Sequence, residues 1–105
     1  MLALLLAAWL LTLQGTVPQE CVTVAVSQPT PVFRLKEGDV YKRGPMVSFV
    51  ITEEGKVESV KLIKSSGIQR LDREILKTLL KWKYKPRPAG CGIVEIEMAV
   101  TIHFR

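Results

Sequence analysis

The stretch MVSFVITEEGKVESVKLIK, Met46–Lys64, contains the two clearest strand patterns of this 105-residue chain. In its first half, apolar side chains recur at every second position, which is the period of a strand with one buried face: Val47, Phe49 and Ile51. A tight turn follows at EEGK, where Gly55 can adopt the positive φ that hairpin turns require. The remaining residues return as a second strand. The stretch therefore predicts a β-hairpin.

A helix is predicted directly after the hairpin, over IQRLDREILKTLLKW at residues 68–82. The motif Ser65-Ser66-Gly67 precedes it and supplies a serine hydroxyl that can accept a hydrogen bond from an unpaired amide at the helix start. Pro86 prevents the helix from continuing. Apolar side chains at steps of four, four and three form one stripe along the helix: Leu71, Ile75, Leu79 and Trp82.

The C-terminal segment 93–104 alternates throughout, and one set of its side chains is apolar: Val94, Ile96, Met98, Val100, Ile102 and Phe104. The order of elements is therefore strand, strand, helix, strand. Two strands joined by a crossover helix are normally parallel, which leaves room for the first strand between them. We predict an α+β fold of the β-β-α-β type, with a three-stranded antiparallel sheet in the order 2-1-3. One helix packs on a face of this sheet, and an irregular N-terminal arm precedes it.

The first thirteen residues, MLALLLAAWLLTL, are apolar except for Thr12. A membrane-spanning helix needs about 20 residues, so this run fits the apolar core of a secretory signal better. A short inner-membrane anchor is the alternative. We therefore divide the chain into a signal peptide or short anchor at 1–15, an N-terminal arm at 16–43 and a folded domain at 44–105. Either reading of this run implies a chain that is exported from the cytoplasm.

An exported chain with two cysteines, Cys21 and Cys91, can form one intramolecular disulfide. Closing a loop of this length stabilises a fold by about 4 kcal/mol in the chain-entropy model, which is a large share of a small domain's stability. A redox or metal site is the alternative, but the sequence has no CxxC motif and its one histidine is His103. We expect the disulfide, no metal and no cofactor.

The net charge is +5, and the densest basic run, KWKYKP at 81–86, interleaves lysines with Trp82 and Tyr84. Ammonium groups for phosphates and rings for stacked bases would suit a nucleic-acid surface. The same residues also fit the end of a helix whose ring points into the core while its lysines extend outward. Because the remaining charge is spread along the chain, we prefer the helix end and expect no nucleic-acid partner.

The sequence offers little for catalysis. Ser65 and Ser66 have no recognisable partner base, and a lone His103 on the outer face of a strand is typical of a surface residue. Glu95 and Glu97 share a strand face, but carboxylates on an open strand surface are usually solvated. We therefore expect a binding or structural protein and not an enzyme.

Several short motifs follow one another with a spacing that is more specific than any one of them. In chain order they are Gly44, ITEEGKV at 51–57, Ser65-Ser66-Gly67, Leu71-Asp72, WKYKP at 82–86, Gly92-Ile93-Val94 and a terminal strand that ends in Phe104. Together they make residues 33–105 resemble the C-terminal domain of TonB, the periplasmic energy transducer of bacteria with two membranes.

This resemblance implies a binding module that contributes to energy-coupled transmembrane transport. In the family, the last strand is thought to pair with a short peptide, the TonB box, of outer-membrane transporters, while proton-driven inner-membrane motor proteins pull on the complex. Carried over to this chain, the peptide-binding edge consists of Val94, Glu95, Ile96, Glu97, Met98, Ala99, Val100, Thr101 and Ile102. The alternative is a stand-alone exported domain that forms a homodimer through the same edge strand.

Overall fold

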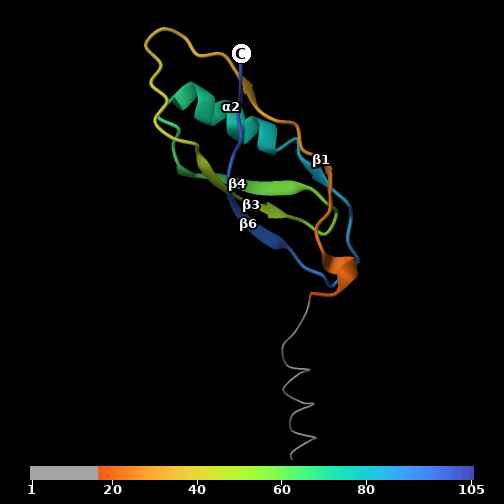
Figure 1. The fold of residues 1–105 in the computed structure, drawn as a ribbon. Coiled ribbons are helices and arrows are strands. Elements are labelled where there is room, and N and C mark those ends of the chain that lie inside the picture. The colour runs from red at the N-terminus through yellow and green to blue at the C-terminus, as the bar shows by residue number, and fades with distance from the viewer. Residues whose placement is uncertain (1–16) are drawn as a thin grey trace, which may run out of the picture.

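A computed structural model describes residues 17–105 of the chain (Figure 1). The expected signal peptide or anchor at 1–15 lies outside the described residues. In chain order the elements are η1 (Gln19–Cys21), β1 (Ala25–Ser27), β2 (Val32–Phe33), β3 (Met46–Ile51), β4 (Val57–Lys64), α2 (Gln69–Leu79), β5 (Lys83–Tyr84), β6 (Val94–Ala99) and β7 (His103–Phe104). Among the described residues, no helix has the length and apolar character needed to span a membrane.

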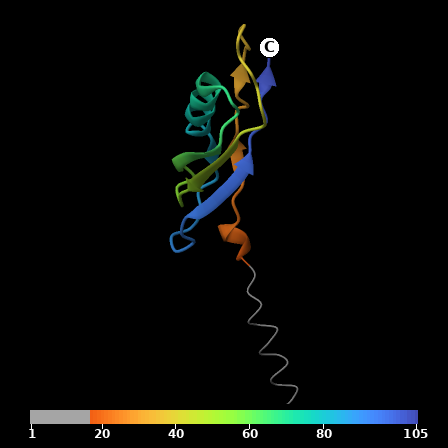
Figure 2. The same cartoon turned by 90° about the vertical axis from the view of Figure 1, so that its left-hand side faces the viewer.

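The main sheet has three antiparallel strands in the order β4-β3-β6, which confirms the predicted 2-1-3 order and the α+β fold (Figures 1 and 2). The central strand β3 alternates in burial because successive side chains of a strand point to opposite faces. On its core face the side chains are at most 1% exposed: Val47, Phe49 and Ile51. The predicted helical stripe covers them with three fully buried side chains, Leu71, Ile75 and Leu79.

The helix α2 ends at Leu79, so the predicted continuation to Trp82 is wrong. A turn follows, in which the Trp82 amide donates to the Leu79 carbonyl at 3.0 Å and brings the indole ring back to the sheet. That ring packs edge-on against Phe49, with ring centroids 5.8 Å apart, and its Nε1 donates to the Pro29 carbonyl at 2.9 Å. Trp82 is buried and cannot stack on a base, so the basic run lacks one of the two rings that a nucleic-acid surface would use.

The start of the helix is organised by a buried carboxylate, Asp72. It accepts hydrogen bonds from both serine hydroxyls and, at 3.0 Å, from the Ser66 amide. The serine hydroxyls accept bonds from amides as predicted, but the donors are Gly67 and Ile68, which precede the first helical residue. The network ties the end of β4 to the first turn of α2, with each polar group paired inside the protein.

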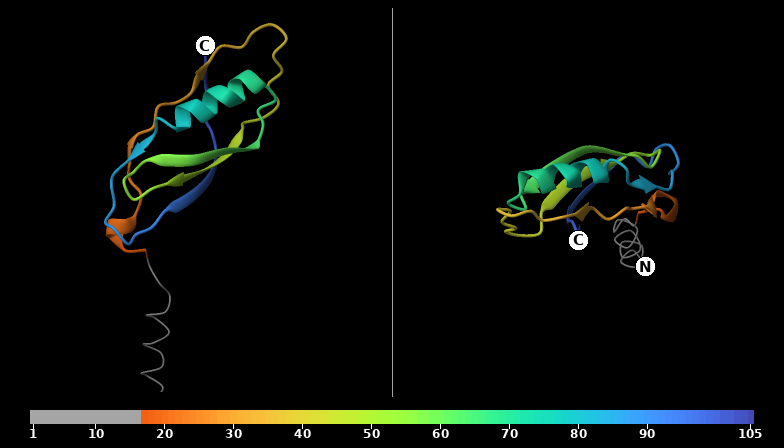
Figure 3. Two further views of the ribbon diagram at one scale, coloured as in Figure 1. Left: turned by 180° about the vertical axis from the view of Figure 1, so that it is seen from behind. Right: turned by 90° about the horizontal axis from the view of Figure 1, so that it is seen from above.

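The N-terminal arm is more regular than predicted, because two short strands pair it with later parts of the chain. β1 pairs antiparallel with β5, and β2 pairs parallel with β7. The arm runs alongside α2, as the views from behind and from above show (Figure 3). Its Phe33 is 7% exposed and belongs to the same core as β3, with the Arg70 guanidinium 4.5 Å from the ring centroid. The arm therefore covers part of the sheet face that one helix leaves open.

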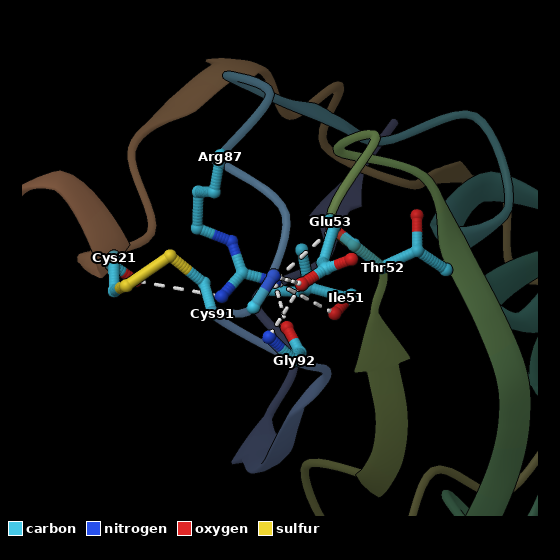
Figure 4. The surroundings of a disulfide bond; sticks show 8 residues. Cys21, Ile51, Thr52, Glu53, Arg87, Cys91 and Gly92 are labelled. Carbon is cyan, nitrogen blue, oxygen red and sulfur yellow. Dashed lines mark hydrogen bonds between the residues drawn. A yellow bond between two sulfur atoms is a disulfide. The ribbon is translucent and has the colours of Figure 1, made fainter.

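A disulfide between Cys21 and Cys91 joins the arm to the loop that leads into β6 (Figure 4). Beside it, the Glu53 carboxylate accepts hydrogen bonds from the Gly90 and Gly92 amides of that loop, at 2.8 and 2.7 Å. The buried guanidinium of Arg87 donates to four backbone carbonyls, those of Cys21, Ile51, Thr52 and Gly92. The disulfide and these side chains hold the arm, the end of β3 and the start of β6 together.

The hairpin glycine provides a test of how closely β5 approaches the turn. Gly55 has φ +86°, and a Cβ there would lie 2.0 Å from the Tyr84 carbonyl oxygen, whereas a Cβ on Gly90, with φ +97°, would meet nothing within 4 Å. We expect Gly90→Ala to lower the free energy of unfolding by about 1–2 kcal/mol, the conformational cost alone. Gly55→Ala adds a clash with the Tyr84 carbonyl, so it should lower the free energy of unfolding, measured in urea, by at least roughly twice as much. Equal losses would contradict this packing of β5.

Replacement of both cysteines by serine tests the disulfide. Because the bond closes a loop of 70 residues, we expect the free energy of unfolding to fall by about 4 kcal/mol in urea titrations. Dithiothreitol should produce the same fall in the wild-type protein and no further change in the Cys21→Ser/Cys91→Ser variant. A wild-type protein insensitive to dithiothreitol would contradict the prediction.

The contact between the arm and the helix predicts a pH dependence. The Arg70 guanidinium donates to Asp39 at 2.8 Å and, with the Lys36 amide, lowers the carboxyl pKa below its ordinary value of 3.8. A carboxyl with a lowered pKa stabilises the fold above that ordinary value and loses its effect as pH falls through the lowered one. Asp39→Asn should therefore reduce the melting temperature at neutral pH, and the difference should vanish in strong acid. A difference in melting temperature that stays the same at all pH values would show that the Asp39 charge is not its cause.

Candidate functional site

The outer backbone groups of β6 are unpaired at one edge of the sheet. β6 pairs with β3 in an unbroken register, and just beyond it the Val100 amide donates to the Pro45 carbonyl at 3.0 Å. Because backbone groups alternate in direction along a strand, this bond orients every second residue toward β3. The residues between them, Glu95, Glu97 and Ala99, direct their amide and carbonyl groups away from β3. Within residues 17–105 these groups have no hydrogen-bond partner.

The opposite edge of the sheet, β4, is irregular. Its register with β3 shifts twice, and Ser59 beside one shift has φ 52°, which is unusual for a residue with a side chain. Lys61 and Lys64 also lie on this strand. Bulges and lysines are common protections of a strand edge against further pairing. The sheet therefore has one protected edge and one regular edge.

The side chains of β6 divide into two rows of different chemistry. Val94, Ile96 and Met98 are half-buried and pack against the core. The other row is exposed on the sheet face that α2 does not cover, and consists of Glu95, Glu97 and Ala99. On that open face, a shallow hollow borders Glu95 and Lys61. A strand added beside β6 would continue both rows.

The predicted site from Val94 to Ile102 is longer than the strand in the structure. β6 ends at Ala99, and Val100 turns into the core with 5% exposure, while Thr101 is exposed and Ile102 is half-buried. The chain then pairs with the arm, where β7 lies parallel to β2. Phe104 is 37% exposed and packs on Tyr41, with ring centroids 5.2 Å apart. The available edge therefore stops where the arm begins to pair.

The arm also borders the other end of β6, which the sequence did not indicate. A shallow apolar hollow beside Val94 is lined by Val17, Cys21, Val22 and Thr23. Further along the arm, Val24 and Val26 are 51% and 68% exposed. The sequence CVTVAV at residues 21–26 alternates like a short strand, but this pattern carries no information about which strand the arm accompanies.

No arrangement for metal binding or acid–base catalysis is visible in the part of the chain that the structure describes. No group of three His, Cys, Asp or Glu side chains there could hold a metal ion. The serine hydroxyls are bound to Asp72 at the helix start, and no hydrogen bond within residues 17–105 joins either of them to His103 on β7. The feature with a clear binding capacity is the free edge of β6.

Comparison with known proteins gives consistent matches. Residues 45–105 match the model of the family described as Gram-negative bacterial TonB protein C-terminal. The Protein TonB of Pseudomonas aeruginosa is 29% identical over 59 residues, which cover 56% of this chain and 17% of that protein. The Protein TonB of Escherichia coli is 31% identical over 48 residues (46% and 20%), and that of Salmonella typhimurium is 32% identical over 59 residues (56% and 22%).

The solution NMR structure of the Pseudomonas aeruginosa TonB CTD aligns with a TM-score of 0.48 and 19% identity, over 79% of this chain and 89% of that chain. The segments matched in the curated TonB proteins make up 17–22% of their lengths. The family model covers more than half of the present chain. This protein therefore belongs to the TonB C-terminal domain family.

Proposed function

We propose that this protein is a periplasmic TonB-like module that binds a peptide of an outer-membrane transporter by strand addition to β6. Its family is one of non-enzymatic domains, so the proposal concerns binding. The role we assign is a contribution to energy-coupled transmembrane transport, with proton-driven inner-membrane proteins as a second class of partner. Residues 1–15, with their apolar run over 1–13, fit this role as an export signal or a short anchor, followed by the arm at 16–43 and the domain at 44–105.

The difference between the two sheet edges carries the proposal. β4 is interrupted by two register shifts, whereas β6 keeps an unbroken register and offers free backbone groups on its outer side. In strand addition, main-chain hydrogen bonds supply affinity and side chains on alternate faces supply specificity. The free backbone groups of Glu95, Glu97 and Ala99 can form the main-chain hydrogen bonds, and the two side-chain rows of β6 can supply the specificity.

Dimerisation through β6 is the competing function. In an antiparallel pair of two β6 strands, side chains on the same face stand opposite each other. The registers with the greatest overlap would therefore place Glu95 or Glu97 of one copy opposite a glutamate of the other. Like charges in this position are destabilising. The charge pattern of the edge favours a different chain as the partner.

Replacement of Glu97 by proline tests strand addition directly. The Glu97 amide points away from β3, so proline removes a free donor and blocks the edge without removing a bond of the sheet. We expect Glu97→Pro to weaken binding of peptides from the periplasm-facing ends of transporters by at least about ten-fold. Glu97→Ala is the matched control, since it removes the same side chain but keeps the amide. Isothermal titration calorimetry provides the measurement.

Two outcomes would contradict the proposal. Unchanged peptide binding by Glu97→Pro would place the peptide elsewhere on the domain. Absence of binding, together with a concentration-dependent dimer that Glu97→Pro dissociates in analytical ultracentrifugation, would favour self-pairing of β6. Amide chemical-shift changes concentrated on Val94–Ala99 during a titration of the wild-type protein would support peptide addition.

A further inference from the structure

We propose that the β6 edge selects a peptide in which basic residues alternate with apolar ones. The lysine or arginine side chains would lie beside Glu95 and Glu97, and the apolar side chains would extend the row of Val94, Ile96 and Met98. This inference rests on the strand addition proposed above and adds the chemical class of the bound segment. Because the two faces of a strand alternate residue by residue, the same pattern is required for a parallel or an antiparallel peptide.

The two glutamates are available for an incoming charge. Both are exposed, and the one ion pair found among residues 17–105 joins Arg70 to Asp39 at the helix start. The inner neighbours of the glutamates on β3 are uncharged: Val50 stands opposite Glu95, and Ser48 opposite Glu97. An added strand would supply the next neighbour on the outer side. A basic side chain there forms an opposite-charge cross-strand pair, whereas an acidic one faces a like charge.

The apolar row on the other face is incompletely covered. Val94, Ile96 and Met98 are half-buried, in contrast to the fully buried row of β3 beside them. The reason is that the sheet ends at β6, so these side chains have an apolar neighbour on one side only. The hollow lined by Val17 and Val22 extends this apolar surface beyond Val94. Apolar side chains of an added strand would lose contact with water here, which favours their binding.

The overall charge of the chain and the local charges of β6 predict opposite peptide preferences. With a net charge of +5, the protein as a whole attracts acidic peptides in preference to basic ones. Local pairing at β6 predicts the reverse preference. Cross-strand opposite-charge pairs change binding by about 1.4- to five-fold each, so two pairs should change it by roughly two- to twenty-five-fold. A preference for the basic peptide can therefore not arise from the net charge.

The experiment compares three short peptides, acetylated and amidated at their ends, with valine at alternate positions. Lysine, glutamine or glutamate occupies the positions between the valines. Binding to the oxidised full chain, kept in a mild detergent, is measured by NMR titration at low salt. We expect the affinities to follow the order lysine, glutamine, glutamate, with the largest shifts on Val94–Ala99 and a smaller spread at high salt.

A charge-matched pair of variants isolates the edge. Glu95→Gln/Glu97→Gln should abolish the preference, whereas Glu58→Gln/Glu74→Gln should retain it. Each double variant removes two exposed carboxylates. Glu58 lies on β4 and Glu74 on α2, so the second variant leaves the β6 edge unchanged. Equal binding of all three peptides at β6, or tightest binding of the glutamate peptide, would overturn the charge selection and leave strand addition intact. Failure of all three to perturb β6 would overturn strand addition itself, and this inference with it.

Discussion

Complete burial of one face of β3 is the constraint on which the rest of the structure depends. Val47, Phe49 and Ile51 are almost inaccessible to water, but a single helix of 11 residues covers only part of a three-stranded sheet. The remaining cover comes from Phe33 on the arm and from Trp82 after the helix. The arm is therefore part of the folded core. The disulfide and the hydrogen bonds of Arg87 hold its first residues at the same end of the sheet as the start of β6.

This arrangement also determines which surface is left for a partner. The first residues of the arm lie beside Val94 at one end of β6, and beyond the other end β7 pairs with β2, so only the middle of β6 is open. Regular pairing with β3 keeps the outer backbone groups of β6 aligned for another strand, and the bulges of β4 make the opposite edge unsuitable. The same placement of the arm thus completes the core and limits the free edge to the middle of β6.

Much of the candidate site was accessible from sequence because its strand pattern is strong. The alternation at 93–104 located the edge strand and assigned the glutamates to the exposed row. It could not show where pairing with β3 ends, since the alternation continues unchanged while the chain moves from β3 to the arm. The helix end was misplaced for a related reason. Trp82 matches the helical stripe by spacing, yet it reaches the core through a turn that forms only against Phe49 and Pro29.

Local pattern was thus sufficient for the hairpin, the helix, the order of the strands and the family, because periodicity and turn residues act over a few neighbours in the chain. The course of the arm, the extent of the free edge and the position of Arg87 depended on contacts between residues far apart in sequence. Arg87 illustrates the difference: a basic residue between two prolines reads as part of a loop, whereas in the fold it is buried and bound to four carbonyls. Those carbonyls converge only after the sheet, the loop and the arm have packed together.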